Sequence, residues 1–154
     1  MSKVKGQFAW CLYDWANSSF PTVITTFVFA AYFTKAVSAD VTSGTAAWGY
    51  AMSLSALTVA FVGPVLGAIV DQGGRRKPWL GFFTAICIMA SALLWLVEPE
   101  PSFAMMALVL VAVANTAFEI GMVFYNAMLP DLVSKGRLGR LSGWGWGFGY
   151  FGGL

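Results

Sequence analysis

The chain has 154 residues, of which 58% are hydrophobic and 10% are charged, and its net charge is +2. A typical soluble domain is roughly 45–50% apolar and roughly 25% charged, and a chain this short cannot bury so large an apolar surface in water. The composition therefore excludes an ordinary soluble domain and makes the lipid bilayer the expected partner. The small and scattered net charge gives no indication of nucleic-acid binding.

Four long stretches of the sequence are almost free of charged residues, and they predict an all-α membrane protein. A spanning helix needs roughly 20 apolar residues, and lipid admits only helices or closed barrels. The stretches lack the alternation that is typical of barrel strands. We therefore expect membrane helices near residues 8–36, 46–70, 79–97 and 103–129.

The first predicted helix contains an unusual polar sequence, Tyr-Asp-Trp-Ala-Asn-Ser-Ser-Phe, at residues 13–20. If the helix is continuous from about Phe8, its period of about 3.6 residues groups several polar side chains on one stripe. These are Asp14, Ser18, Thr25 and Tyr32, with Asn17 beside them. Pro21 lies on the same stripe and frees a backbone carbonyl inside the membrane, as in the broken helices that build transporter sites.

A second interpretation starts this helix at Ser18 or Ser19. Serine would then cap the helix, Pro21 would lie in its first turn, and the preceding aromatic residues would sit at the membrane surface. The sequence leaves both interpretations open. In the first, Asp14, Asn17 and Ser18 are candidates for contact with a substrate or a coupling ion.

A basic loop with two glycines joins the second and third predicted helices. Glycine permits a tight turn there, and Pro78 suits the first turn of the helix that follows. The residues that set the pattern of this loop are Gly67, Asp71, Gln72, Gly74, Arg75 and Arg76.

Glu119 lies deep in the apolar run of the fourth predicted helix, with Asn115 and Asn126 on the same face at helical spacing. A charge inside the bilayer is costly, so such a residue usually faces a cavity or a partner. Two roles remain open for it: a structural hydrogen bond between helices, or a part in substrate or proton handling.

The last residues, 141–154, are uncharged and begin like a fifth membrane helix, but they are too few to cross the bilayer. We therefore expect the sequence to be a fragment of a longer protein. Gly145, Gly149 and Gly153 repeat every four residues, a spacing that favours close helix packing over chemistry.

The basic residues predict the orientation in the membrane. Eight of the nine lie in the N-terminal tail, the second loop and the fourth loop, whereas the third loop carries Glu98 and Glu100. Lysine and arginine favour the cytoplasmic side. The N-terminus should therefore be cytoplasmic.

The second loop resembles the loop between helices 2 and 3 of major facilitator transporters, although Gln72 stands where that superfamily more often has a basic residue. Residues 13–18 and 125–131 resemble a narrower branch, the bacterial relatives of the autophagy-related vacuolar amino-acid effluxers. The resemblance implies a twelve-helix protein of the bacterial cytoplasmic membrane. This chain would supply four helices and the start of a fifth, within the N-terminal six-helix half, and would work with the missing C-terminal half.

The resemblance also implies that the second loop latches the two halves in one conformation, with Arg75 or Arg76 pairing with a carboxylate such as Asp131. The expected function is secondary transport of a small solute, such as an amino acid or related metabolite, with a proton as a candidate coupling ion. The alternative is a small four-helix membrane scaffold. We expect no enzyme, metal or cofactor, because the chain has no His and its two cysteines, Cys11 and Cys87, lie in apolar surroundings.

Overall fold

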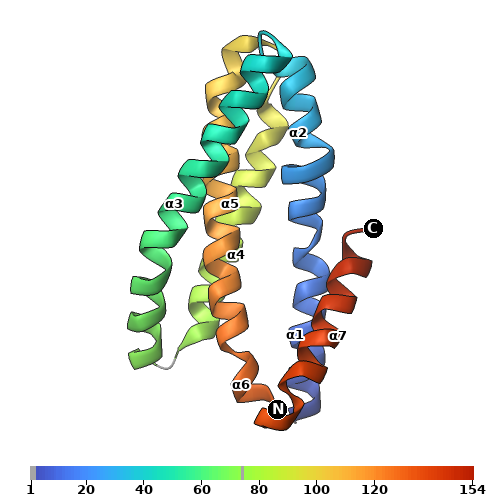
Figure 1. Cartoon of the computed structure of the whole chain (residues 1–154), viewed down its shortest axis with the longest axis vertical. Helices are drawn as coiled ribbons and strands as arrows, with labels where there is room; N and C mark the ends of the chain where they lie inside the picture. The colour runs from blue at the N-terminus through green and yellow to red at the C-terminus, as the bar shows by residue number, and fades with distance from the viewer. Residues whose placement is uncertain (1–2, 74) are drawn as a thin grey trace.

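The computed structural model describes residues 3–73 and 75–154, except for the side chains of residues 3 and 70–73. The first rod of the molecule is built from four helical segments in succession. They are α1 (Lys3–Asn17), the π-helical η1 (Pro21–Phe27), α2 (Phe29–Tyr32) and the π-helical η2 (Phe33–Val37). Together they run the length of the molecule (Figure 1).

The second rod is a single long helix, α3 (Val41–Gly73), which has Pro64 inside it. The chain then turns back into α4 (Arg76–Leu93), which tightens into a 3-10 turn, η3 (Leu94–Leu96). In Figure 1, α3 and α4 converge with α5 toward the end of the molecule opposite the N-terminus.

The third part of the chain crosses back and ends in a shorter helix. A 3-10 turn, η4 (Pro101–Phe103), leads into α5 (Ala104–Ala127), and α6 (Leu129–Leu132) follows after a bend. The turn η5 (Lys135–Arg137) then reverses the chain into α7 (Leu138–Gly152). The helix α7 lies beside α1, and the C-terminal residue ends partway along the rod (Figure 1).

Four of these helical stretches are long and apolar enough to cross a membrane: Val4–Val37, Val41–Ile69, Arg76–Leu96 and Pro101–Leu132. The described residues contain no strand. The prediction of an all-α membrane protein with four spans is therefore confirmed. Each span begins before its predicted position, because polar residues in the first turns, such as Thr42 and Ser43, are helical although they are not apolar.

The helix α5 is the centre of the packing. It supplies residues to all three buried clusters: Ala107 and Val111 near one end, Ala114 and Ala117 in the middle, and Ile120, Phe124 and Tyr125 near the other end. Its neighbours in these clusters are mainly α3, α4 and the first rod. Alanines at the middle of α5 and at Ala90 of α4 let the two backbones approach closely, as is usual between membrane helices.

The outer face of α3 carries a stripe of exposed apolar side chains. In order along the helix they are Leu54, Leu57, Phe61, Val65 and Ile69. In water such a stripe would be an aggregation hazard, whereas in a membrane it is an ordinary lipid-facing surface.

Candidate functional site

The polar sequence at residues 13–20 is inside a continuous helical rod. The backbone N–H of Ser18 donates to the carbonyl of Asp14 at 3.0 Å, as in an uninterrupted helix. The Ser18 hydroxyl also donates to that carbonyl, at 2.8 Å, and so does not cap a new helix. The interpretation that starts the helix at Ser18 or Ser19 is wrong, and Asp14 lies well inside the span.

Proline 21 marks the point where the first rod changes from α-helical to π-helical geometry. Proline cannot donate a backbone hydrogen bond, and π turns often occur where a helix ladder is disturbed near functional sites. Threonine hydroxyls satisfy the backbone carbonyls nearby: Thr22 donates to the carbonyl of Ser18 and Thr25 to that of Pro21, each at 3.0 Å. These two hydroxyls bond to backbone carbonyls near the proline, so the middle of the rod stays hydrogen-bonded where the helix changes its geometry.

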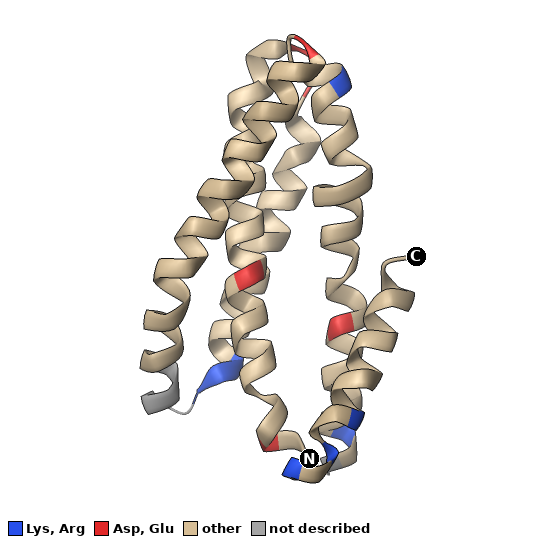
Figure 2. Cartoon of the chain, viewed as in Figure 1, with Lys and Arg blue, Asp and Glu red and all other residues tan. Residues whose placement is uncertain are grey.

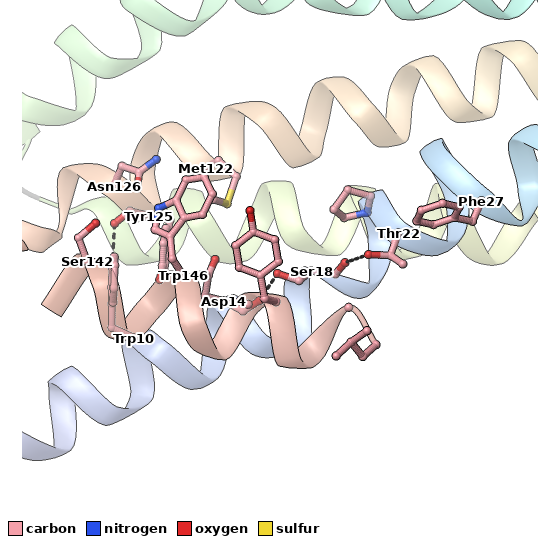
Figure 3. Close-up of a pocket in the computed structure, with 15 residues that line it drawn as sticks. Trp10, Asp14, Ser18, Thr22, Phe27, Met122, Tyr125, Asn126, Ser142 and Trp146 are labelled. Atoms are coloured by element: carbon pink, nitrogen blue, oxygen red, sulfur yellow. Dashed lines mark hydrogen bonds between the residues drawn. The ribbon is translucent and has the colours of Figure 1, made fainter. Parts of the chain in front are cut away.

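A pocket of about 480 Å³ opens between the first rod, α5 and α7 (Figure 3). The first rod contributes Asp14, Ser18 and Thr22 to one wall. The facing walls are partly aromatic and come from α5 and α7, with Tyr125, Asn126, Trp146 and Tyr150 among their residues. Of the residues expected from the sequence, this pocket brings together Asp14, Ser18 and Asn126.

The carboxylate of Asp14 is half-buried, and no hydrogen bond reaches it from the described residues. It faces Gly149 of α7: a Cβ built on that glycine would lie 2.8 Å from Asp14 Oδ2 and 2.9 Å from Ser18 Oγ. Glycine at this position therefore lets α7 approach α1 without covering the two oxygens.

A second pocket, of about 690 Å³, lies between the first rod, α3 and α5. It contains Asn115 and Glu119, and Pro21 lines both this pocket and the first. The side chain of Glu119 is exposed to the pocket and makes no hydrogen bond within the described part of the chain. The two carboxylates expected from the sequence thus line separate pockets that meet at Pro21.

Asn115 instead lies in a buried polar network. Its Nδ2 donates to Ser55 Oγ of α3 at 2.9 Å, and Ser55 shares a further hydrogen bond of 2.9 Å with Thr116. Asn115 is 7% exposed and Ser55 only 1%. This network joins α3 to α5, so the role of Asn115 seen here is a structural hydrogen bond between helices.

Asn17 lines neither of these two pockets. It lines a third one, of about 460 Å³, between the first rod and α4, and its Nδ2 donates to Met122 Sδ at 3.4 Å. The stripe expected along the first rod is likewise divided: Thr25 lines the second pocket, and the Tyr32 hydroxyl donates to the carbonyl of Val97 at 2.9 Å.

The loop after α3 is held to the end of α5 by Arg76. Its Nη1 donates to Asp131 Oδ2 and to the carbonyl of Ala127, each at 2.7 Å. Of the residues proposed for a latch, Arg75 is exposed and Gly67 is half-buried in α3. Gly74 and the side chain of Asp71 lie outside the described residues.

Sequence reasoning missed the aromatic side of the first pocket. Trp10 and Tyr125 stack with their ring centroids 4.2 Å apart and their planes at 7°. The Trp10 indole also donates to the carbonyl of Tyr125 at 3.1 Å. The sequence spacing could have indicated these aromatic residues. Trp10 lies one helical turn before Asp14, and Trp146 lies one turn before Tyr150, so each pair shares a helix face.

The family model described as "Vacuole effluxer Atg22 like" matches residues 32–154. The chain belongs to the vacuole effluxer Atg22-like family. This confirms the resemblance to that branch of the major facilitator transporters. The match includes Glu119 and the Arg76–Asp131 pair, whereas Asp14, Asn17 and Ser18 precede the matched residues.

Two curated relatives of this Atg22-like chain come from bacteria. It is 34% identical over 151 residues to the uncharacterized MFS-type transporter YxiO of Bacillus subtilis (strain 168). The matched region covers 96% of this chain and 35% of the relative. It is 26% identical over 144 residues to an uncharacterized protein of Aquifex aeolicus (strain VF5), covering 94% of this chain and 35% of the relative. The chain thus spans about a third of the length of these relatives. No solved structure matches it.

Proposed function

We propose that this Atg22-like chain is part of a secondary transporter that moves a small polar solute by alternating access. The observation that supports this most directly is a pair of largely apolar pockets within the spanning helices that each contain a carboxylate, Asp14 in one and Glu119 in the other. Carboxylates are rare within spans and usually mark a substrate or ion pathway. Membership of a transporter family supports transport over catalysis.

The charge distribution supports a cytoplasmic N-terminus. Lysine and arginine gather at the end of the molecule that holds the N-terminus, the α3–α4 connection and the start of α7 (Figure 2). The other end carries mainly acidic residues, with Lys35 beside them. By the positive-inside rule the first end faces the cytoplasm, and for a bacterial protein the membrane would be the cytoplasmic one.

The contact between Arg76 and Asp131 supports a latch at that same end. It joins the start of α4 to α6, the short helix after α5, so it resists movement of these two helices relative to each other. A latch of this kind would favour one conformation of the transport cycle. Alternating access also needs a second half of the protein, which we expect from the remaining two thirds of the relatives' length.

The test is a solute screen with the full-length protein in proteoliposomes, with and without a pH gradient, comparing wild type with Glu119→Gln. The variant keeps the shape and most hydrogen-bonding capacity of Glu119 but removes its titration. If Glu119 carries the coupled proton, the variant should lose uphill transport and retain downhill exchange.

Glu98→Gln is the matched control, since Glu98 is an exposed carboxylate in the connection between η3 and η4. It should transport like wild type. Unchanged uphill transport by Glu119→Gln would make that residue structural. Failure of the wild type to move any solute would instead favour a membrane scaffold.

A further inference from the structure

We propose that the pocket between the first rod, α5 and α7 binds the ammonium group of a small organic cation, with Asp14 and Ser18 as its direct contacts. The inference rests on the proposed transport function and names the class of solute. It starts from the charge of the pocket: among the described residues that line it, Asp14 is the only carboxylate and none is Lys or Arg. The described lining of the pocket therefore offers one acidic side chain and no basic one.

The wall formed by the first rod offers hydrogen-bond acceptors. The hydroxyl hydrogen of Ser18 is used by the carbonyl of Asp14, and that of Thr22 by the carbonyl of Ser18. A hydroxyl whose hydrogen is already donated can only accept, as an ionised carboxylate does. Asp14, Ser18 and Thr22 thus form a line of acceptors one turn apart (Figure 3), which is complementary to a group rich in N–H donors.

Two of these acceptors are close enough to bind the same group. Asp14 Oδ2 and Ser18 Oγ lie near each other, because both are within 2.9 Å of the position that a Cβ on Gly149 would take. An ammonium group has three N–H donors and can reach two such oxygens at once. A charge-assisted hydrogen bond to the carboxylate would be the stronger of the two.

The opposite side of the pocket offers aromatic faces. Trp146 and Tyr150 of α7 line it and are exposed, whereas the rings of Trp10 and Tyr125 are stacked on each other. A cation is attracted to the face of an aromatic ring, most strongly to tryptophan. An alkylammonium ion would therefore meet a carboxylate on one side and aromatic faces on the other.

An unpartnered hydroxyl lies beside this pocket. The side chain of Tyr125 is only 2% exposed, and its buried hydroxyl has no hydrogen-bond partner among the described residues. Such groups in native proteins are rare and call for an explanation, of which an absent bound molecule is one. The hydroxyl lies against Gly145 of α7, beside the pocket rather than open to it.

Other solute classes fit the pocket less well. An anion would be repelled by Asp14, and a neutral solute would leave that desolvated carboxylate without a counter-charge. A zwitterion would bring a carboxylate of its own, for which the described lining provides no basic partner. A net-cationic amine avoids all three costs.

The test is equilibrium binding of radiolabelled phenethylamine to the purified full-length protein in lipid nanodiscs at neutral pH. Unlabelled phenylalanine and 2-phenylethanol serve as competitors with the same ring but a zwitterionic or neutral head. Phenethylamine should bind at least about tenfold more tightly than either, since a site built for a charged donor rejects analogues that lack it. Equal competition by the alcohol or the amino acid would overturn the proposal.

Three variants locate the binding to this pocket. Asp14→Asn should weaken phenethylamine binding about tenfold or more, because it removes the charged acceptor. Trp146→Leu should weaken it roughly two- to fivefold through loss of the aromatic face, and this exposed position tolerates the change without loss of folding. Glu98→Gln, outside the pocket, should bind like wild type. Unchanged binding by both Asp14→Asn and Trp146→Leu would refute the site.

Transport measured in parallel separates this inference from the proposed function. If the wild type moves a neutral or zwitterionic solute but does not bind phenethylamine, the protein is a transporter and the cation site is wrong. If phenethylamine binds in an Asp14-dependent manner but no solute is moved, the site is correct and the transport proposal fails.

Discussion

The carboxylate of Asp40 sets the beginning of α3. Its Oδ1 accepts the backbone N–H groups of Thr42 and Ser43 at 3.0 and 2.9 Å, and the Ser43 hydroxyl donates to Oδ2. These are backbone donors that the first turn of a helix leaves without a partner. The Ser43 hydroxyl bond, followed by the backbone bonds, holds the pKa of Asp40 below its usual range.

The lowered pKa predicts how the first turn of α3 responds to acid. A group whose pKa is lower in the folded state stabilises that state above its unfolded pKa, about 3.9 for Asp, and this contribution is lost as the pH falls through the folded pKa. We therefore expect hydrogen exchange of the Thr42 and Ser43 amides to quicken below that range, once corrected for intrinsic rates.

Asp40→Asn is the matched variant, because it keeps an oxygen acceptor for the cap but cannot titrate. Its first turn should remain protected, with no comparable acid-dependent loss. Asp40→Ala should lose protection at every pH. A similar acid response in Asp40→Asn and in the wild type would show that the cap does not depend on the carboxylate charge.

At the residue level, the sequence predicted which side chains are unusual but not what they contact. Asn115 and Glu119 are one turn apart on α5 and were expected to share a face. Both line the second pocket, but Asn115 is also bound to Ser55, whereas Glu119 makes no hydrogen bond within the described part of the chain. Helical spacing fixes the direction of a side chain, but the partner depends on which small or polar residue the neighbouring helix presents at that height.

At the level of helices, α7 is docked on α1 through its glycines. Gly145, Gly149, Gly152 and Gly153 all face the first rod at distances that leave no room for a Cβ. The expected four-residue glycine pattern on α7 therefore does serve close packing. The contact at Gly152 is the most demanding, because a Cβ there would meet the backbone carbonyl of Trp15, which cannot move aside as a side chain could.

Gly152→Ala should therefore destabilise the docking of α7 on α1. Overpacking of this kind costs about 1–3 kcal/mol. The control is Gly147→Ala on the same helix, because a Cβ at Gly147 meets nothing within 4 Å. That control should be neutral or stabilising by up to about 1 kcal/mol, since alanine is the better helix former. Thermal unfolding of the full-length protein, followed by tryptophan fluorescence, measures both, and equal melting temperatures would contradict the packing argument.

The pair of Arg76 and Asp131 should matter to movement more than to stability. Asp131 is 70% exposed, and an exposed ion pair contributes about 0.2–1 kcal/mol. We expect Asp131→Asn to lower the transport rate several-fold while leaving the melting temperature almost unchanged. The charge-swapped variant, Arg76→Asp with Asp131→Arg, should recover part of the rate. Normal transport by Asp131→Asn would exclude a latch at this pair.

At the level of the whole molecule, hydropathy and charge were sufficient to predict the spans. Both are sums over many residues, so errors at single positions cancel. The π-helical segments η1 and η2 were not predicted, although Pro21 marks the start of the first. The pockets were likewise not predictable, since each needs residues from two or three helical segments that are far apart in the sequence.

The orientation gives a prediction at this scale. Cysteine introduced at Glu100 should react with an impermeant thiol reagent added outside intact cells, whereas cysteine at Lys135 should react only after permeabilisation. Both positions are exposed, and the natural cysteines are buried, at 5% for Cys11 and 6% for Cys87, so background labelling should be low. The reverse pattern would invert the topology.

The π-helical turns of the first rod have a consequence for where this rod can change its number of residues. Each holds a hydrogen bond across five residues, from Val28 to Val23 and from Ser38 to Phe33, so each accommodates one residue more than an α-turn. Deleting one residue between Pro21 and Phe27 would be absorbed by restoring an α-turn, whereas deleting one from the α-helical stretch before Pro21 would rotate everything after it by about 100°. Phe29, Phe33 and Val37 would then leave their buried cluster together. Across related sequences a one-residue deletion in the first rod should therefore occur within Pro21–Phe27 rather than in the α-helical stretch before it.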